Sequence, residues 1–251
     1  MIALRGLTKH YGSFTAVDGI DLRVLAGELF GFVGPNGAGK TTTLRIIAGI
    51  LQPSAGTVEI GGIDIARNPT AAKSKLGFIP DRPFIYEKLT GLEFLHFVAG
   101  LYGEAGSTVE HRARELLALF DLEEWAHELV ESYSHGMRQK LIIGSAFIHR
   151  PDVLVVDEPM VGLDPKAARI LKDLFREYVH RGHTIMMSTH TLEVAEALCD
   201  RIGIIQDGKI RALGTLDELR AQHAGHERLE EIFLALTGER AARAAMDVLD
   251  A

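Results

Sequence analysis

The architecture of this chain follows from one segment, Leu29-Phe30-Gly31-Phe32-Val33 followed directly by Gly34-Pro35-Asn36-Gly37-Ala38-Gly39-Lys40-Thr41. The first five residues form an apolar run with the length of a buried strand, and residues 42–48 have helical character. The next eight match the phosphate-loop pattern Gly-x-x-x-x-Gly-Lys-Ser/Thr. Because this pattern lies between a strand and a helix, it predicts a polyphosphate site.

Each residue type in this loop has a physical reason to be there. Glycines let backbone N–H groups turn inward around a phosphate, and the helix N-terminus adds a positive dipole end. Lys40 is expected to neutralise the β and γ phosphates, and the Thr41 hydroxyl to hold Mg²⁺. The alternative is a glycine turn that merely opens a helix. The expected nucleotide-binding residues of the loop are Gly34, Pro35, Asn36, Gly37, Ala38, Gly39, Lys40, Thr41 and Thr42.

Further apolar runs of strand length recur later in the chain. Between them lie segments of helical period, in which one apolar stripe runs along a helix of about four turns. Asp207-Gly208 separates two short strands, as in a hairpin. Strands that alternate with helices predict a parallel α/β sheet. The runs are Val153 to Val156, Thr184 to Ser188 and Ile202 to Ile205, and the stripe is Ala167, Ile170, Leu171, Leu174, Phe175 and Tyr178.

Two carboxylates, Asp157 and Glu158, end one of these runs. Acids at this place lie at the C-terminal edge of a buried sheet, where α/β proteins bind ligands. Asp157 is expected to orient the Mg²⁺ shell, and Glu158 to activate water as a general base. A strand that simply meets solvent is the alternative, which the phosphate loop disfavours.

Composition narrows the function classes. The chain has 251 residues, of which 47% are apolar, and 27 Lys+Arg against 34 Asp+Glu give a net charge of −7. An acidic chain without a long basic run is not held to nucleic acid by bulk charge, so no nucleic-acid partner is expected. No apolar run approaches the roughly 20 residues needed to cross a bilayer, so any transport requires a pore from another chain.

At Asp157-Glu158-Pro159, Gly162-Leu163-Asp164 and Thr189-His190 the sequence resembles the nucleotide-binding subunit of ATP-binding cassette (ABC) transporters, from about Ile2 to Leu219. The resemblance implies an α/β P-loop NTPase (RecA-like) with a mostly parallel sheet core, an N-terminal antiparallel β region and an inserted helical subdomain. It also implies that residues 162–164 lie across a dimer interface and that His190 senses the γ phosphate.

The segment Tyr133-Ser134-His135-Gly136-Met137 resembles the family signature Leu-Ser-Gly-Gly-Gln, of which Ser134 and Gly136 are retained. Ser134 is a good N-cap, and a capped helix N-terminus is an anion site. A helix cap without a ligand is the alternative. In the family this element completes the partner subunit's site, so hydrolysis is expected to require a second chain.

Two further residues are assigned by resemblance. Asp81 stands where the family usually has a glutamine that touches Mg²⁺ or water; a metal contact and a surface-turn role are both open for it. Tyr11 matches the aromatic that stacks on adenine, although an aromatic in an early strand often belongs to the core.

The domain organisation is expected to be an ATPase domain over residues 1–225, with a helical subdomain inserted at about 85–150, and a helical tail over 226–251. The tail is read as two amphipathic helices, Leu229 to Leu236 and Ala241 to Leu249. Most of the aromatics Phe84, Tyr86, Phe94, Phe97 and Tyr102 are expected to pack inside the helical subdomain, and an exposed subset to form a groove for a permease helix. The histidine pairs 180/183 and 223/226 have helix-compatible metal spacing but are read as solvated helix faces.

The resulting hypothesis is a cytoplasmic Mg²⁺-ATPase subunit that lies peripherally on the inner face of the membrane. It is expected to dimerise around two ATP molecules and to drive a separate integral membrane permease. A weak analogy favours an export system. One rival is a soluble cassette ATPase that clamps ribosomes or DNA; such relatives generally carry two cassettes or a long coiled coil. Another is a regulatory module that binds nucleotide without hydrolysis.

Overall fold

The computed structural model describes residues 1–81, 84–223, 226 and 228–238. Its strands are β1 (Ile2–Tyr11), β2 (Phe14–Val24), β3 (Leu29–Val33), β4 (Ala55–Ile60), β5 (Ile63–Asp64), β6 (Leu76–Ile79), β7 (Val153–Asp157), β8 (Thr184–Thr189), β9 (Arg201–Gln206) and β10 (Lys209–Gly214). The expected strands at 29–33, 153–156, 184–188 and 202–205 are all present, and residues 207–208 form the turn between β9 and β10.

The helices are α1 (Lys40–Ile47), α2 (Pro69–Lys73), α3 (Gly91–Leu101), α4 (Ser107–Leu119), α5 (His135–Phe147), α6 (Pro165–His180), α7 (Leu192–Leu198) and α8 (Leu216–Gln222), with short 3₁₀ turns η1 (Glu123–Trp125) and η2 (Val130–Ser132). A further helix covers 229–238, where the first tail helix was expected. The second, at 241–249, falls outside the described residues. Within the described ranges no helix is both long enough and apolar enough to span a bilayer.

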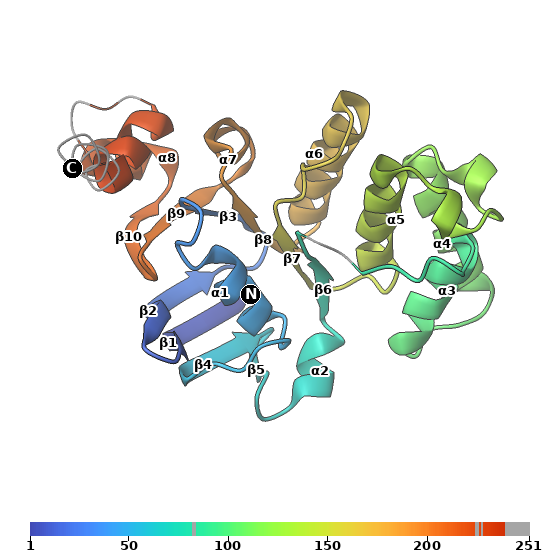
Figure 1. Cartoon of the computed structure of the whole chain (residues 1–251), viewed down its shortest axis with the longest axis horizontal. Helices are drawn as coiled ribbons and strands as arrows, with labels where there is room; N and C mark the ends of the chain where they lie inside the picture. The colour runs from blue at the N-terminus through green and yellow to red at the C-terminus, as the bar shows by residue number, and fades with distance from the viewer. Residues whose placement is uncertain (82–83, 224–225, 227, 239–251) are drawn as a thin grey trace, which may run out of the picture.

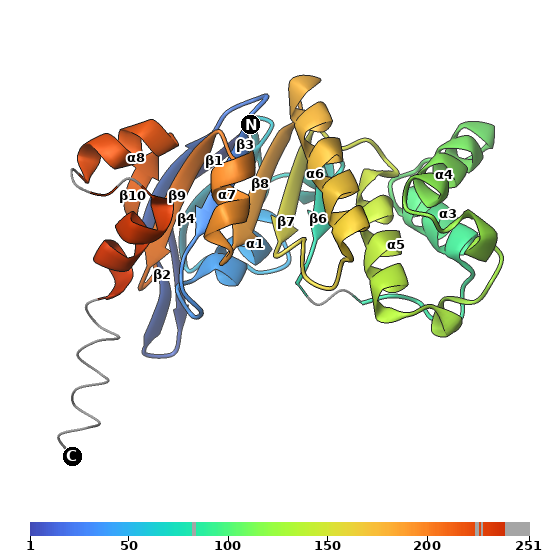
Figure 2. The ribbon, with the colours of Figure 1, turned by 90° about the horizontal axis from the view of Figure 1, so that it is seen from above.

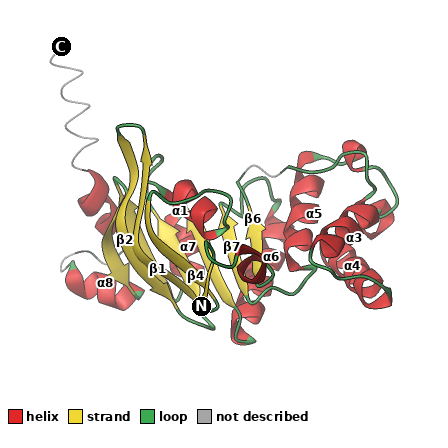
Figure 3. Ribbon diagram, turned by 90° about the horizontal axis from the view of Figure 1, so that it is seen from below, coloured by secondary structure: helices red, strands yellow, loops and turns green. Residues whose placement is uncertain are grey.

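Two sheets form the body of the molecule. The larger has the order β10-β9-β3-β8-β7-β6, and all its pairings except that of β10 with β9 are parallel. The smaller, β2-β1-β4-β5, is antiparallel. Figures 1 and 3 show the antiparallel sheet on one side of the larger sheet, next to α1. These findings confirm the expected fold class.

The parallel strands consist mainly of buried apolar residues, as expected for a sheet that is covered on both faces. Along β7 and β8, alternate side chains enter different cores. Val153, Val155 and Met186 pack with α1 and the antiparallel sheet. On the opposite face lie Leu154, Val156, Ile185 and Met187, together with α5 and α6.

We call α3, α4 and α5 the helical lobe. It lies beyond β6, at the opposite end of the molecule from α8 (Figures 1 and 2). Its core is apolar and includes Phe94, Leu117, Phe120 and Leu141, all buried. The lobe therefore lies beside the sheet, and one continuous hydrophobic core joins it to the face of the sheet that α6 covers.

Candidate active site

The phosphate loop connects β3 to α1, as its sequence predicts. Gly39, the N-cap of α1, has φ 107°, and a Cβ there would lie 2.4 Å from the carbonyl oxygen of Ala16. At Gly34 a Cβ would lie 2.3 Å from the carbonyl oxygen of Ile205. Both positions exclude any side chain, so the glycines are required by close backbone approach as well as by the turn.

Lys40 extends back over this loop. Its side chain is buried, and its Nζ donates hydrogen bonds to the carbonyl oxygens of Gly34 at 2.6 Å and Pro35 at 3.1 Å. Burial lowers the pKa of Lys40, and the charges of Glu158 and Asp157 oppose this effect. A buried ammonium held by neutral carbonyls is a ready counterion for a phosphate that enters the loop.

The acidic pair stands at the end of β7, beside the end of β8. Asp157 is paired in register with Ser188, whose hydroxyl donates a hydrogen bond of 2.5 Å to its Oδ1. The backbone N–H of Glu158 faces both the carbonyl oxygen of Ser188 at 3.2 Å and its Oγ at 3.3 Å. Sequence reasoning missed Ser188. Ser188 is recognised only from strand register, which places it opposite Asp157 in the neighbouring parallel strand.

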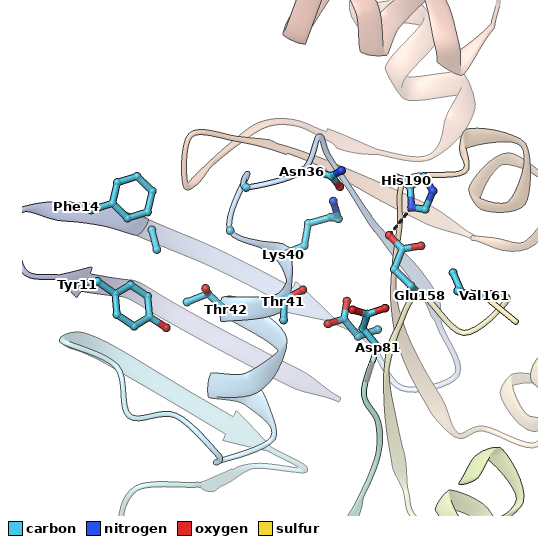
Figure 4. A pocket seen from close by; sticks show the side chains of 14 residues that line it. Tyr11, Phe14, Asn36, Lys40, Thr41, Thr42, Asp81, Glu158, Val161 and His190 are labelled. Atoms are coloured by element: carbon cyan, nitrogen blue, oxygen red, sulfur yellow. Dashed lines mark ion pairs between the residues drawn. The ribbon is translucent and has the colours of Figure 1, made fainter. Parts of the chain in front are cut away.

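Glu158 adopts the left-handed conformation, with φ 51°, which is unusual for a residue other than glycine. Its Oε1 lies 2.8 Å from Nδ1 of His190, which follows β8. Strain of this kind persists where the surroundings over-determine the backbone, and it clusters at functional sites. The conformation and the His190 contact together direct the carboxylate toward the phosphate loop (Figure 4).

These groups line one pocket of about 400 Å³. In Figure 4, Lys40, Glu158 and His190 lie together at one end, Asp81 lies beyond Thr41, and Tyr11 and Phe14 stand at the other end. Of the residues expected at the nucleotide site, Gly34, Pro35 and Ala38 belong to the loop backbone without lining the cavity, and Ser134 and Gly136 lie outside it. The lining residues are Tyr11, Phe14, Ala16, Asn36, Gly37, Gly39, Lys40, Thr41, Thr42, Asp81, Asp157, Glu158, Val161 and His190.

Tyr11 is not a core residue, because 49% of it is exposed. It faces Phe14 across the turn between β1 and β2, and Phe14 is 61% exposed. The Nζ of Lys9 lies 5.4 Å from the centre of the Tyr11 ring. The pocket therefore ends in two accessible aromatic faces that suit a flat base. Phe14 was not predicted as a site residue, because its exposure depends on how the β1–β2 hairpin packs against the rest of the chain.

Oxygen donors gather where Mg²⁺ is expected. Thr41, Asp81 and Asp157 line the same pocket, and hard oxygen ligands of this kind suit Mg²⁺. Among the described residues, no group of three or more His, Cys, Asp or Glu forms a metal cage. One hydroxyl and two carboxylates beside the phosphate loop suit an ion that shares its coordination with substrate phosphates, which is how Mg²⁺ usually binds.

The signature segment begins α5. Ser134 is its N-cap, and its side chain accepts a hydrogen bond of 3.3 Å from the N–H of Met137. Tyr133, which replaces the usual leucine, is 3% exposed and donates a 2.5 Å hydrogen bond to the carbonyl oxygen of Trp125. Burial, followed by the charge of Glu128, raises the pKa of Tyr133 to about 12. The tyrosine thus belongs to the core of the lobe and leaves the exposed Ser134 unobstructed.

Other expectations were wrong. Of the five clustered aromatics only Phe94 is buried; Phe84, Tyr86, Phe97 and Tyr102 are exposed. Residues 84–88 lie mostly at the surface and hold Phe84 and Tyr86 outside the core. The histidine pairs do not share helix faces, because α6 ends at His180 and α8 ends at Gln222.

Three exposed aromatics define what we call the aromatic groove. Tyr86 contacts Phe84 and Phe97 edge to face, with ring centres 5.4 and 4.9 Å apart. The hollow has a volume of about 740 Å³ and reaches Asp81. It is lined by Asp81, Phe84, Ile85, Tyr86, Glu87, Lys88, Leu89, Phe97, His135, Arg138, Gln139 and Ile142.

Comparison with known proteins agrees with this geometry. Residues 17–161 match the ABC transporter family. The daunorubicin resistance ATP-binding protein DrrA3 of Streptomyces coeruleorubidus is 38% identical, over 98% of this chain and 77% of its own.

Two solved structures resemble the whole cassette. One, described as the ATP-binding subunit of an ABC transporter, is 34% identical with a TM-score of 0.89, over 94% of this chain and 99% of its own. The other is an ATP-binding cassette dimer in a post-hydrolysis state with ADP and Pi; it is 27% identical with a TM-score of 0.78, over 86% of this chain and 98% of its own. The family match agrees with three features of the structure: a phosphate loop beside an acidic strand end, an exposed aromatic hairpin and an inserted helical lobe. This chain therefore belongs to the ABC transporters, as an ATP-binding subunit that hydrolyses ATP.

Proposed function

We propose that two cassettes, this chain and a second copy or close relative, close around two Mg²⁺-ATP molecules and so drive a separate integral membrane permease. The observation that carries the proposal is the division of the site. Lys40, Glu158 and His190 line the nucleotide pocket, whereas Ser134 lies outside it. A single chain therefore holds two half-sites, and the exposed N-terminus of α5 is available to a partner's nucleotide.

The proposed reaction needs little covalent chemistry from the protein. Lys40 and the N-terminus of α1 stabilise charge on the transferring phosphoryl group. Glu158 accepts a proton as water attacks the γ phosphorus and the bond to the bridging oxygen breaks. His190 orients this carboxylate at 2.8 Å.

The metal site of the proposal uses Thr41 and Asp157, with Asp81 as a third donor. Bound Mg²⁺ would neutralise phosphate charge and orient the leaving group. Ser188 holds one oxygen of Asp157, which leaves the other oxygen for the metal shell. An aspartate at residue 81 would add negative charge near the γ phosphate, and bound Mg²⁺ would have to offset this charge.

We propose further that the complex lies on the inner face of the membrane and exports its cargo. The name of the resistance protein from Streptomyces supports outward transport. The aromatic groove offers an apolar docking surface for a cytoplasmic helix of the permease. The ATPase domain over residues 1–225 with its inserted lobe is the unit that closes, and residues 226–251 are an appended tail.

The test has two parts. Glu158→Gln subunits in millimolar Mg²⁺-ATP should form a dimer by light scattering and return to monomers when ATP is removed; a persistent monomer would contradict the two-site closure. Affinity purification from detergent-solubilised membranes should recover a polytopic membrane protein. Recovery of ribosomes or DNA instead would favour a soluble clamp.

A further inference from the structure

Arg138 lies in the first turn of α5 and its side chain makes three hydrogen bonds, two of them to the segment that leads into the signature. Its Nε donates to the carbonyl oxygen of Tyr133 at 3.1 Å, which belongs to the peptide directly before Ser134. One terminal nitrogen donates to the carbonyl oxygen of Glu131 at 2.9 Å. The other pairs with the carboxylate of Glu87 at 2.5 Å. The planar guanidinium thus links the backbone before Ser134 to Glu87, a residue 51 positions before Arg138.

Glu87 belongs to the wall of the aromatic groove. The groove segment is also bridged to the approach of the signature by backbone hydrogen bonds, from Glu131 N–H to the carbonyl of Glu87 at 3.0 Å and from Val130 N–H to the carbonyl of Leu89 at 2.9 Å. A second ion pair, Lys88 to Glu131 at 2.5 Å, lies on the outside of this bridge. Hydrogen bonds and ion pairs therefore tie residues 87–89 to residues 130–138.

We propose that Arg138 is a positioning residue that couples the aromatic groove to Ser134. The inference rests on the proposed function, in which Ser134 completes the site of a second cassette. When a partner helix shifts residues 84–89, the Glu87–Arg138 pair carries that shift to the peptide before Ser134. The serine hydroxyl and the N-terminus of α5 then move toward or away from the opposing nucleotide.

The two ion pairs differ in what they can transmit. The side chain of Arg138 is 30% exposed and touches the carbonyl before Ser134, whereas that of Lys88 is 83% exposed and pairs with the carboxylate of Glu131. Screening by water makes the outer pair weak. Lys88→Ala is therefore a matched control, because it removes a cation from the same bridge but leaves intact the hydrogen bond from Arg138 to the carbonyl oxygen of Tyr133, directly before Ser134.

The experiment uses full-length Glu158→Gln protein, and measures its ATP-dependent dimer affinity by light scattering. Arg138→Ala should weaken the dimer by roughly tenfold, since hydrogen bonds of a charged group are lost in both subunits. Glu87→Gln should weaken it in the same direction, roughly threefold, although Glu87 is remote from the signature. Combined, the two changes should cost no more than Arg138→Ala alone, and Arg138→Lys should recover part of the affinity.

Three readouts separate positioning from a structural role. ATP affinity of the monomer and the midpoint of thermal unfolding should stay near those of the parent in the Glu87→Gln variant, which keeps the inference testable if Arg138→Ala fails to fold. Fluorescence of Trp125, the single tryptophan, should shift in Glu87→Gln because its ring lies 6.0 Å from that of Tyr133. Unchanged dimer affinity in Glu87→Gln, or an equal loss in Lys88→Ala, would overturn the inference. A parent Glu158→Gln protein that never dimerises would instead overturn the proposed function.

Discussion

The edge of the parallel sheet and the helical lobe hold their parts of the site in different ways. At the sheet edge, Asp157 and Ser188 are 2% and 0% exposed and lie opposite each other in neighbouring strands. In the lobe, Ser134 is exposed and depends on a helix cap and on a partly solvated arginine. A buried strand cannot change its register without disrupting the core, whereas the side chains of an exposed ion pair can rearrange. The difference separates groups that must stay fixed for chemistry from a group that can be repositioned.

The largest effect is expected at the sheet edge, from Glu158→Gln. The change keeps the shape of the side chain and removes its basicity, so phosphate release should fall by roughly 10² to 10⁴ while ATP affinity is retained. Equilibrium binding of fluorescent ATP is the control. Near-normal turnover would remove Glu158 from its assigned role.

Next in size is Ser188→Ala, which takes away the hydroxyl that holds Asp157 and faces the N–H of Glu158. A hydrogen bond to a charged group contributes about 1.5–3 kcal/mol, so kcat/KM should fall roughly ten- to hundredfold. The Mg²⁺ concentration for half-maximal nucleotide binding should rise with it. Ser188→Thr, which keeps the hydroxyl and suits a strand, should stay close to the parent; equal losses in both variants would point to packing alone.

A smaller loss is expected in the lobe. Ser134→Ala should lower turnover roughly tenfold, as expected for a lost hydrogen bond to a charged phosphate, while ATP affinity of the monomer is unchanged. Ser134→Gly is the matched control, because glycine costs a helix N-terminus only a few tenths of a kcal/mol. If Ser134 were only a cap, the glycine variant would turn over normally.

The smallest effect concerns the junction of the two regions. His149 stacks on Tyr102 with ring centres 3.5 Å apart, and its Nε2 lies 3.1 Å from the carbonyl oxygen of Leu76 in β6. Its buried Nδ1 has no hydrogen-bond partner within the described part of the chain. Burial lowers the pKa of His149 below its ordinary 6.5, and the Leu76 carbonyl opposes this effect.

The unfolded chain therefore binds more protons than the folded one as the pH falls through 6.5, so acid destabilises the junction. The melting temperature should drop by a few degrees more in the parent than in His149→Gln between pH 7.5 and 5.5, a range that brackets the ordinary pKa of histidine, roughly 6.5. Parallel curves for the two proteins would show that His149 does not contribute.

The parts of the site that could be predicted from the sequence are those with a local physical cause. The glycines and Lys40 follow from one loop between a strand and a helix. Asp157 and Glu158 follow from an apolar run that ends in acids, and parallel strands bring their C-terminal ends to one edge. Each of these inferences needs only neighbouring residues and the direction of a strand.

What the tertiary structure decided depends on residues far apart in the chain. Ser188 reaches Asp157 from 31 positions away through strand register, and Arg138 reaches Glu87 across the lobe. The exposure of Phe84 and Tyr86 depends on how residues 84–88 lie on the surface. Register and packing are properties of the closed core, in which many weak contacts act together, so no local pattern encodes them.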